Sequence, residues 1–580
     1  MTEQAEVGAI DPHPAATDRP LAGDYPEVTG TSWRQGRSRF PLGKPILSSP
    51  ERPRDRRRSR AARRSTGLVR KCHIDPYCLD RVVRECPRAE GFDRGGDQGG
   101  PQTISTHVSH AELDRAAGVL LGSAAGDALG AGYEFGPVGP ADPAMVGGGY
   151  LGWEPGEWTD DTQMALCVAE EAATSFLDPA AVGARFLDWF SGGPRDVGNQ
   201  TRAVLSAGGS PALLPAEAAA YFRAHPENGA GNGSLMRTGP VVLAVSGDDA
   251  KLGELARSVS ELTHADPLTG DACVLWCVGI HRAIHENRLD GVQDGVALLP
   301  EERREFWTGT IAEATSRPPS SFNPNGYVVT AFQAALASVL QTPVPTTRPC
   351  RHLQEALRTA VRVGHDTDTV AAIAGSLLGA RWGATAVPAR WQAVLHGWPS
   401  YLAPDLVRLA VLAVSEGRDN PTTRWPSADD LGGYYGGAFP ADPIHEALDD
   451  DDGVIVANWA GDAKVEADVA VSLCRVGRRQ IHAPERVEIR LLDEDPPEAN
   501  PNLEFVFADL AETITAWRDE GKKVLVHCVP AERRTPAVAA AYLASRLGVS
   551  SDEAFRRVRR VLPRARVNPS FRSALERLWS

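Results

Sequence analysis

Two short clusters of acidic and hydroxyl side chains, far apart in the sequence, have residue types that suit a metal site. One is Trp158-Thr159-Asp160-Asp161-Thr162 and the other is Gly364-His365-Asp366-Thr367-Asp368-Thr369; a run of small apolar residues follows each. Taken singly, each cluster is typical of a helix start, where hydroxyls and carboxylates cap free amides and suit the helix dipole. Two such clusters in one chain favour a site for Mg²⁺ or Mn²⁺, because ligands that are all oxygen suit these ions rather than zinc.

A cysteine and an arginine in one short loop form a second candidate site. The segment is His527-Cys528-Val529-Pro530-Ala531-Glu532-Arg533-Arg534-Thr535, between an apolar run and a helical pattern. Loop amides and a helix N-terminus lower the pKa of such a thiol and bind a phosphate group. Arg534 is placed to bind phosphoryl oxygens in a bidentate manner. Thr535 is placed to bond the sulfur and assist turnover of a phosphoenzyme.

Length and composition limit the class of protein. A chain of 580 residues predicts two or three domains. Its net charge of −14 argues against a nucleic-acid-binding protein. It contains no uninterrupted apolar run of about eighteen residues, so no membrane span is expected. No secretory signal pattern opens the chain and the 9 cysteines form no framework, which predicts a cytoplasmic location.

The elements that must position these residues fall into four segments. Residues 1–108 are rich in Pro, Gly, Ser and Arg and are expected to be disordered, as a tether for nucleic acid or an acidic partner, as a solvated tail, or as a segment upstream of the real start codon. Residues 109–415 show helical patterns joined by short loops and predict an all-α domain. Residues 416–452 are expected to be a linker. Residues 453–580 alternate short strands with helices and predict a small α/β domain.

Two local patterns refine this prediction. In the helix expected over 111–130, Gly118, Gly122 and Gly126 are four residues apart, which allows a helix or a ligand to approach closely. In the α/β segment, strands are expected at 454–456, 469–473, 487–492 and 523–527 and a helix at 536–547. Cys167, Cys273 and Cys277 lie on apolar helix faces and are expected in the core.

Residues 110–415 resemble the ADP-ribosylglycohydrolases, a family that includes dinitrogen-reductase-activating glycohydrolases and ADP-ribosyl-acceptor hydrolases. The resemblance rests on motifs that occur in the family's order: GSAAGDALGAGYEF, WTDDTQ, DVGNQT, GNGSLMR, THADP and GHDTDTVAAIAG. It implies a compact all-α fold with two divalent metal ions at the base of a cleft. The metal ligands it implies, one aspartate bridging, are Thr159, Asp160, Asp161, Asp366, Asp368 and Thr369.

The same resemblance implies the catalytic and binding residues. Glu134 matches a mobile glutamate that acts in catalysis, and Asp196 matches an aspartate that assists ribose opening or proton transfer. The loop that receives the diphosphate, with a histidine that lines the ligand, corresponds to Gly231, Asn232, Gly233, Ser234 and His264.

This chemistry is consistent with the residue types themselves. Cleavage at the anomeric carbon of ribose develops positive charge, which a nearby carboxylate stabilises. Two hard cations would orient the sugar through its vicinal hydroxyls, and amides at a glycine-rich turn would bind the diphosphate. The acceptor expected from the motifs is arginine on an ADP-ribosylated protein; serine linkages, nucleic-acid linkages and small-molecule esters remain alternatives.

The Cys528 segment and the rest of 453–580 resemble a dual-specificity protein phosphatase acting on a phosphoprotein. The resemblance implies a general acid upstream of the cysteine, Asp495, with Asp493 as the alternative. Ala531 departs from the family, which has glycine at this position. An alanine forced to positive φ costs about 1 kcal/mol. A phosphate-binding module without turnover, or an ADP-ribose-binding regulatory protein with an inactive pseudophosphatase, therefore stays open.

Overall fold

The computed structural model describes residues 108–174, 176–245, 247–418, 442–474, 476 and 483–580. Residues 1–107 of the expected tail, with its basic run, and 419–441 of the expected linker lie outside these ranges. All described residues belong to one compact unit, His73–Ser580. Within these ranges, no helix has the length and apolar character that crossing a membrane requires.

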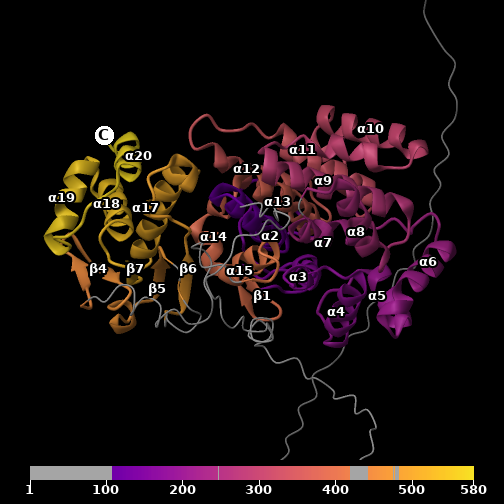
Figure 1. The fold of residues 1–580 in the computed structure, drawn as a ribbon, viewed down its shortest axis with the longest axis horizontal. Coiled ribbons are helices and arrows are strands. Elements are labelled where there is room, and N and C mark those ends of the chain that lie inside the picture. Colours follow the sequence, from indigo (N-terminus) through magenta and orange to yellow (C-terminus); the bar gives the residue numbers. More distant parts are fainter. Residues whose placement is uncertain (1–107, 175, 246, 419–441, 475, 477–482) are drawn as a thin grey trace, which may run out of the picture. The chain divides into compact units, whose positions relative to one another are not determined.

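The part of the chain from residue 110 to 414, called the helical body below, is built of helices, with its longest loop at residues 131–159 (Figure 1). This confirms the predicted helical class. One addition is a short antiparallel ribbon of β1 (His396–Gly397) and β2 (Tyr401–Leu402), which is too short to give an alternating pattern. The helices are α2 (His110–Gly130), α3 (Asp160–Ala172), α4 (Pro179–Ser191), α5 (Asn199–Gly208), α6 (Leu214–Ala224), α7 (Leu235–Thr238), α8 (Asp249–Glu261), α9 (Pro267–Glu286), α10 (Glu301–Ser316), α11 (Val328–Gln341), α12 (His352–Arg362), α13 (Thr367–Trp382), α14 (Ala389–Val394) and α15 (Ala403–Val414).

Helices α2 and α13 pack with their backbones in contact at the centre of the helical body. A Cβ added at Gly118 would lie 2.1 Å from the carbonyl oxygen of Gly379, and one at Gly126 would lie 2.0 Å from that of Ala371. The glycines of α2 therefore admit another helix, one of the two possibilities open from the sequence. At the end of this contact, Thr367 Oγ1 donates a hydrogen bond to the Gly130 carbonyl (2.8 Å). The first turn of α13 is thereby fixed beside the last turn of α2.

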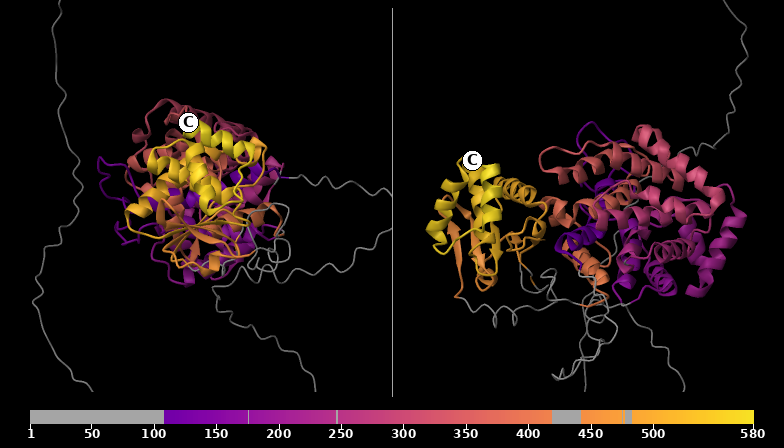
Figure 2. Two further views of the ribbon diagram at one scale, coloured as in Figure 1. Left: turned by 90° about the vertical axis from the view of Figure 1, so that its left-hand side faces the viewer. Right: turned by 45° about the horizontal axis from the view of Figure 1, so that its top comes forward.

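The remaining described residues, 442–580, form an α/β module with a mixed sheet in the order β3-β4-β7-β5-β6 (Figure 2). β3 pairs antiparallel with β4, and the other pairs are parallel. Figure 1 shows its helices gathered along one side of the strands. Its elements are β3 (His445–Leu448), β4 (Asp451–Asn458), β5 (Val469–Ser472), β6 (Glu485–Glu488), α17 (Leu503–Asp519), β7 (Val524–Cys528), α18 (Arg534–Leu547), α19 (Ser551–Val561) and α20 (Pro569–Leu578).

Two details of this module differ from the sequence-based prediction. β3 and the start of β4 lie within the segment expected to be a linker, because β3 is short and mostly exposed and carries little apolar signal. The strand expected at 487–492 is observed as β6, which ends at Glu488; the apolar residues beyond it, among them Leu491 and Leu492, are buried without being part of the sheet.

A buried ion pair and a hydrogen bond connect the module to the helical body. Arg408 of α15 bonds Asp405 on its own helix (3.1 Å) and Glu488 of β6 (2.8 Å). Arg490, which follows β6, donates to the carbonyl oxygen of His110 at the start of α2 (2.9 Å). Removing one partner of such a buried pair is costly, because the other charge is left without compensation.

The α2–α13 contact generates the first prediction. Gly126→Ala should lower the free energy of unfolding by roughly 1–3 kcal/mol, because the added methyl group meets a backbone carbonyl that cannot move alone. Denaturant titration followed by circular dichroism measures this change. Gly309→Ala is the matched control, because Gly309 is exposed in α10 with no atom near its Cβ position. The free energy of unfolding of this variant should be unchanged or rise by up to about 1 kcal/mol. Equal effects of the two substitutions would contradict the packing argument.

Candidate functional site

The acidic cluster after Trp158 forms the first turn of α3. Thr159 is the N-cap, and Asp160 and Asp161 follow it in the helix. These three residues are buried, with at most 7% of their surface exposed. The backbone N–H of Thr159 donates to Asp127 Oδ1 on α2 (2.9 Å). The start of α3 is therefore attached to α2, and its carboxylates point into the protein interior.

The second acidic cluster forms the start of α13. Asp366 is the N-cap residue, with Asp368 in the first turn. Asp366 N–H donates to Asn325 Oδ1 (3.0 Å), which fixes the loop before the helix. Thr369 Oγ1 donates to Asp161 Oδ2 on α3 (3.3 Å). The two acidic clusters, far apart in the sequence, are adjacent in the fold.

Carboxylates from α2, α3, α13 and the loop after α2 converge in two groups. Oxygen atoms of Asp127, Asp161 and Asp368 lie within 4.8 Å of one another, and so do oxygen atoms of Glu134, Asp366 and Asp368. Asp368 belongs to both groups, which is the position of a bridging ligand. Asp160 is buried beside these groups without belonging to either.

The donor set fits hard divalent cations. Asp161 Oδ1 and Asp368 Oδ1 are buried without a hydrogen-bond partner, as oxygens reserved for a cation would be. Burial, and then the charges of the neighbouring carboxylates, raise the pKa of Asp161 and Asp368 well above the usual value. Burial likewise raises the pKa of Asp127 to about 6 and, with Asp366 as the next cause, the pKa of Glu134 to about 8. Oxygen ligands in this arrangement suit Mg²⁺ or Mn²⁺.

Asp127 is a member of this site that the sequence analysis missed. It lies on α2, fully buried, and accepts hydrogen bonds from the backbone of Thr159 and from Thr162 Oγ1 (2.6 Å). The signal that points to it is a carboxylate within a helix of small apolar residues, a placement that requires a partner. Without the other clusters, the same pattern indicates only an interrupted amphipathic helix.

Glu134 is held near Asp366 by contact between two loops. The N–H of the next residue, Phe135, donates to the carbonyl oxygen of His365 (2.7 Å), and their rings pack edge to face. Phe135 and His365 both have positive φ, 50° and 67°. Backbone strain of this kind tends to occur at functional sites, where the surroundings hold it. Asp196, in the loop before α5, is half-buried, and its pKa is raised by burial and by Asp366.

The glycine-rich turn lies on the same side of the protein as the acidic groups. Asn232 Nδ2 donates to Asp366 Oδ2 (2.8 Å), so the turn is connected directly to the second acidic cluster. Gly231 and Gly233 face the ring of His264, whose Nε2 would be 3.5 and 3.3 Å from a Cβ at those positions. Ser234 is different: its hydroxyl is buried against Cys273 Sγ (3.6 Å). Ser234 therefore faces the core, and only its backbone is available to a ligand.

The three cysteines expected in the core of the helical body, Cys167, Cys273 and Cys277, are all buried. Cys528 lies elsewhere, at the carboxyl end of β7 in the middle of the sheet, and is fully buried. The preceding residue, His527, is positioned by Ser472 Oγ (2.7 Å) and by Asp462 Oδ2 (3.2 Å). Burial, followed by the charge of Arg534, lowers the pKa of His527 to about 4, so its ring is neutral.

The loop after Cys528 leads into α18, which begins at Arg534. Arg534 Nη1 donates to the carbonyl oxygen of Leu473 (2.6 Å), and Thr535 Oγ1 is buried without a hydrogen-bond partner. Ala531 has φ 54°, the left-handed conformation for which glycine is preferred. Ala531 therefore adopts the backbone conformation that glycine would favour at this position.

Of the two candidate general acids, Asp493 is engaged in an ion pair with Arg533 of the cysteine loop (3.3 Å). Asp495 is exposed, and its backbone carbonyl accepts a hydrogen bond from Ser570 Oγ. The loop that carries both residues is held at its base by Asn500, whose side chain bonds both the N–H (2.8 Å) and the carbonyl (2.9 Å) of Leu492. This arrangement favours Asp495 as the group available for proton transfer.

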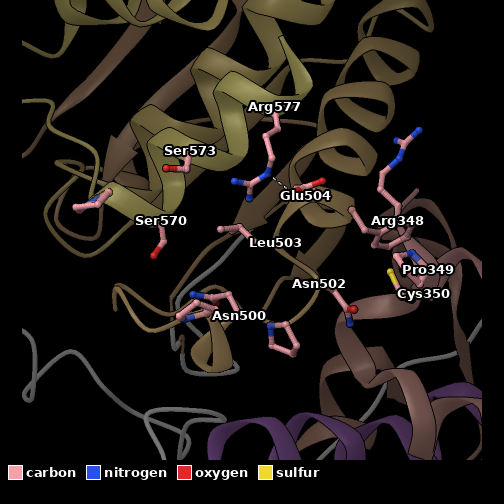
Figure 3. A pocket seen from close by; sticks show the side chains of 14 residues that line it. Arg348, Pro349, Cys350, Asn500, Asn502, Leu503, Glu504, Ser570, Ser573 and Arg577 are labelled. Atoms are coloured by element: carbon pink, nitrogen blue, oxygen red, sulfur yellow. Dashed lines mark hydrogen bonds and ion pairs between the residues drawn. The ribbon is translucent and has the colours of Figure 1, made fainter. Parts of the chain in front are cut away.

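A separate cavity of about 490 Å³ lies against the starts of α17 and α20 and residues 348–350 (Figure 3). Arg577 pairs with Glu504 in its wall (2.5 Å), and Ser570 also lines it. Neither the acidic groups nor Cys528 contribute to its lining. The cavity is thus distinct from both candidate sites.

Comparison with known proteins assigns the helical body. Residues 109–423 match the sequence model of the ADP-ribosylglycohydrolase family. The ADP-ribosyl-[dinitrogen reductase] glycohydrolase of Rhodospirillum rubrum is 32% identical over 289 residues, covering 49% of this chain and 90% of the relative. The chain belongs to the ADP-ribosylglycohydrolase family. The ADP-ribosylarginine hydrolase Tri1 of Pseudomonas putida (strain GB-1) is 31% identical over 291 residues, covering 48% of this chain and 73% of the relative.

The α/β module is assigned in the same way. Residues 463–578 match the sequence model of the dual specificity phosphatase catalytic domain. The two matches show that the protein combines an ADP-ribosylglycohydrolase domain with a dual-specificity phosphatase domain.

Among solved structures, an ADP-ribosylglycohydrolase-related protein complex aligns with a TM-score of 0.42 and 30% identity, covering 53% of this chain and 99% of that chain.

The buried carboxylates of the glycohydrolase predict a pH-dependent stability. Their folded-state pKa values, about 6 for Asp127 and about 8 for Glu134, exceed the ordinary values of 3.8 and 4.5. Between the ordinary and the folded-state pKa values, the folded state binds more protons than the unfolded state. The stability that these protons contribute is lost as the pH rises through the folded-state pKa values. We expect the free energy of unfolding of the metal-free protein to fall between about pH 5 and about pH 8, and Mg²⁺ or Mn²⁺ to remove the fall.

Denaturant titrations with a chelator and with added metal measure this effect. Asp368→Asn should show a smaller fall without metal and no stabilisation by metal, because one charge of the shared site is gone. A wild-type protein whose stability, relative to Asp368→Asn, does not fall over this range would contradict the prediction.

Proposed function

We propose that the glycohydrolase domain is a metal-dependent hydrolase that removes ADP-ribose from arginine side chains of modified proteins. The observation that supports this most is the convergence of two acidic groups on Asp368. A protein that only bound ADP-ribose would have little need for two carboxylate groups whose mutual repulsion opposes folding. The ligands of the two ions would be Thr159, Asp160, Asp161, Asp366, Asp368 and Thr369, with Asp127 orienting the start of α3.

Each group has a role that its position suits. Two bound cations supply positive charge that orients the ribose hydroxyls. Glu134, half-buried and held near Asp366, is placed to activate water or to stabilise the charge that develops at the anomeric carbon. Asp196 is a second carboxylate close to Asp366, available for proton transfer. The backbone of the turn from Gly231 to Ser234 is placed to bind the diphosphate.

Arginine as the acceptor is supported by the relatives. The Pseudomonas putida protein is an ADP-ribosylarginine hydrolase, and the Rhodospirillum rubrum protein acts on ADP-ribosyl-dinitrogen reductase. The bovine ADP-ribosylhydrolase ARH3 is more distant, at 26% identity.

This proposal predicts linkage-specific hydrolysis. With Mg²⁺ or Mn²⁺, the full chain should release ADP-ribose from an arginine-modified peptide, measured by chromatography, and a serine-modified peptide should react more slowly. Asp368→Asn should lower the rate by at least about 100-fold, because it removes the shared ligand. Asp188→Asn, an exposed carboxylate of α4, is the control and should keep the wild-type rate. Release from the serine peptide alone would refute the arginine assignment.

A second activity is supported by the geometry around Cys528. We propose that the α/β module is a cysteine-dependent phosphatase for a phosphoprotein, with Cys528 as nucleophile, Arg534 binding the phosphate and Asp495 as general acid. The support is the placement of Cys528 at the end of β7 and of Arg534 at the start of α18, joined by a loop in which Ala531 has the left-handed conformation that glycine favours. Thr535 Oγ1, buried without a partner, is available to the sulfur. Phosphate binding without turnover is the competing proposal.

The two proposals differ in their response to substitution. If the module is a phosphatase, wild-type protein should hydrolyse p-nitrophenyl phosphate and Cys528→Ser should abolish the reaction; equal rates would exclude catalysis by the thiol. Ala531→Gly should raise the free energy of unfolding by up to about 1 kcal/mol, because it relieves left-handed strain, and should not lower the rate. Ala541→Gly, within helix α18, is the control. It should lower the free energy of unfolding by about 1 kcal/mol.

A further inference from the structure

Thr263, beside the glycine-rich turn, orients two polar side chains at once. Its backbone carbonyl accepts a hydrogen bond from Gln200 Nε2 (3.1 Å), and its hydroxyl oxygen lies 2.7 Å from His264 Nδ1. Thr263, Gln200 and His264 are buried, with exposed fractions of 0%, 8% and 2%. In such a setting, hydrogen bonds fix both orientation and protonation.

Arg237 determines the direction of the hydrogen bond to His264. A guanidinium group only donates, and Arg237 Nη2 lies 2.6 Å from Thr263 Oγ1. If His264 Nδ1 also donated to this oxygen, the hydroxyl hydrogen of Thr263 would be buried without an acceptor. The hydroxyl therefore donates to Nδ1. Burial, followed by the charge of Arg237, lowers the pKa of His264 well below its usual value, so the ring is neutral and carries its hydrogen on Nε2.

Gln200 is oriented by the same residue. Because the Thr263 carbonyl can only accept, the amide nitrogen of Gln200 must face it, and Oε1 must face the other way. Gln200 Oε1 is buried and has no hydrogen-bond partner. An acceptor left in this state destabilises the protein, and a ligand that supplies a hydrogen would recover that loss.

The amide oxygen and the imidazole N–H face the same place. A Cβ at Gly231 would lie 3.6 Å from Gln200 Oε1 and 3.5 Å from His264 Nε2. Glycine at this position leaves a gap the size of one methyl group beside both atoms. No hydrogen bond among the described residues engages His264 Nε2. The same turn reaches Asp366 through Asn232, so this space adjoins the proposed metal site.

We propose that Gln200 Oε1 and His264 Nε2–H form a preset acceptor–donor pair that binds a hydroxyl group and the adjacent oxygen of a ribose diphosphate. Gln200 is then a specificity-determining residue, and Arg237 and Thr263 are positioning residues that act through it and through His264. This inference rests on the proposed glycohydrolase function. A buried acceptor that receives no hydrogen disfavours binding, so a ligand that lacks the hydroxyl binds more weakly.

A comparison of ligands tests the pair. The full chain with Mg²⁺ is titrated calorimetrically with ADP-ribose and with analogues that each lack one ribose hydroxyl. Wild-type protein should bind one of these analogues about ten-fold more weakly than ADP-ribose, and Gln200→Met, which keeps the length of the side chain, should bind the two equally. Gln333→Met is the matched control, since Gln333 is also buried and donates to a backbone carbonyl (3.2 Å), but lies in α11; it should keep the wild-type discrimination.

Equal weakening of all the ligands by Gln200→Met, or no change at all, would overturn the assignment. If the wild type binds no ADP-ribose with either metal, the proposed function and this ligand are both wrong. The arrangement of the pair has its own readout in the ligand-free protein. In ¹⁵N spectra of the wild type, the signal of His264 is identified as the histidine signal that is missing in His264→Gln. This signal should show the Nε2–H tautomer.

Two variants of Thr263 complete the test. Thr263→Ser keeps the hydroxyl and should keep the tautomer, whereas Thr263→Val removes the hydroxyl and should lose the preference. A wild-type or Thr263→Ser spectrum with the hydrogen on Nδ1 would refute the relay, and both can be measured even if Thr263→Val does not fold.

Discussion

The backbone contact between α2 and α13 is the constraint on which the glycohydrolase site depends. The carbonyls of Gly379 and Ala371 occupy the positions that the side chains of residues 118 and 126 would fill. Asp127 follows Gly126 directly, and Asp368 lies in the first turn of the opposite helix, so this approach brings the two carboxylates into one group. Packing that is favourable along the helices thus enforces a charge arrangement that is unfavourable at their ends. A bound divalent cation would resolve this conflict, because it would turn the repulsion between the carboxylates into coordination.

Two consequences follow for the surrounding chain. The loop that carries Glu134 is held by Phe135 and His365, both in left-handed conformations. Such strain persists only where neighbouring contacts over-determine the backbone, and here the contact joins the loop after α2 to the start of α13. On the other side, the buried Arg237 supports the glycine-rich turn by donating to the Gly233 carbonyl (2.9 Å). The rigid helix pair therefore carries loops whose positions are set from both sides.

The sequence predicted the helical and α/β classes, the acidic clusters and the cysteine loop, because each depends on local signals: caps, periodicity and short motifs. It did not predict Asp127, since a buried carboxylate among small residues gains meaning only from partners far away in the chain. The role of Gln200 was hidden for the same reason, because it depends on Thr263 and Gly231, which no spacing connects. Ser234 matches the motif, yet its hydroxyl faces Cys273; a motif specifies residue types and not the direction of a side chain. β3 escaped detection because an exposed strand has no apolar pattern.

The cysteine loop shows how a local departure from a family pattern can be tolerated. Ala531 occupies a left-handed position at a cost of about 1 kcal/mol, but its neighbours restrain the loop independently: Glu532 pairs with Arg566 (2.9 Å) and Arg533 with Asp493 (3.3 Å). These pairs connect the loop to the segment before α20 and to the segment that carries Asp495. The charged residues of the loop thus restrain the conformation that the alanine opposes. The left-handed conformation of Ala531 thus persists because contacts made by its neighbours hold the loop.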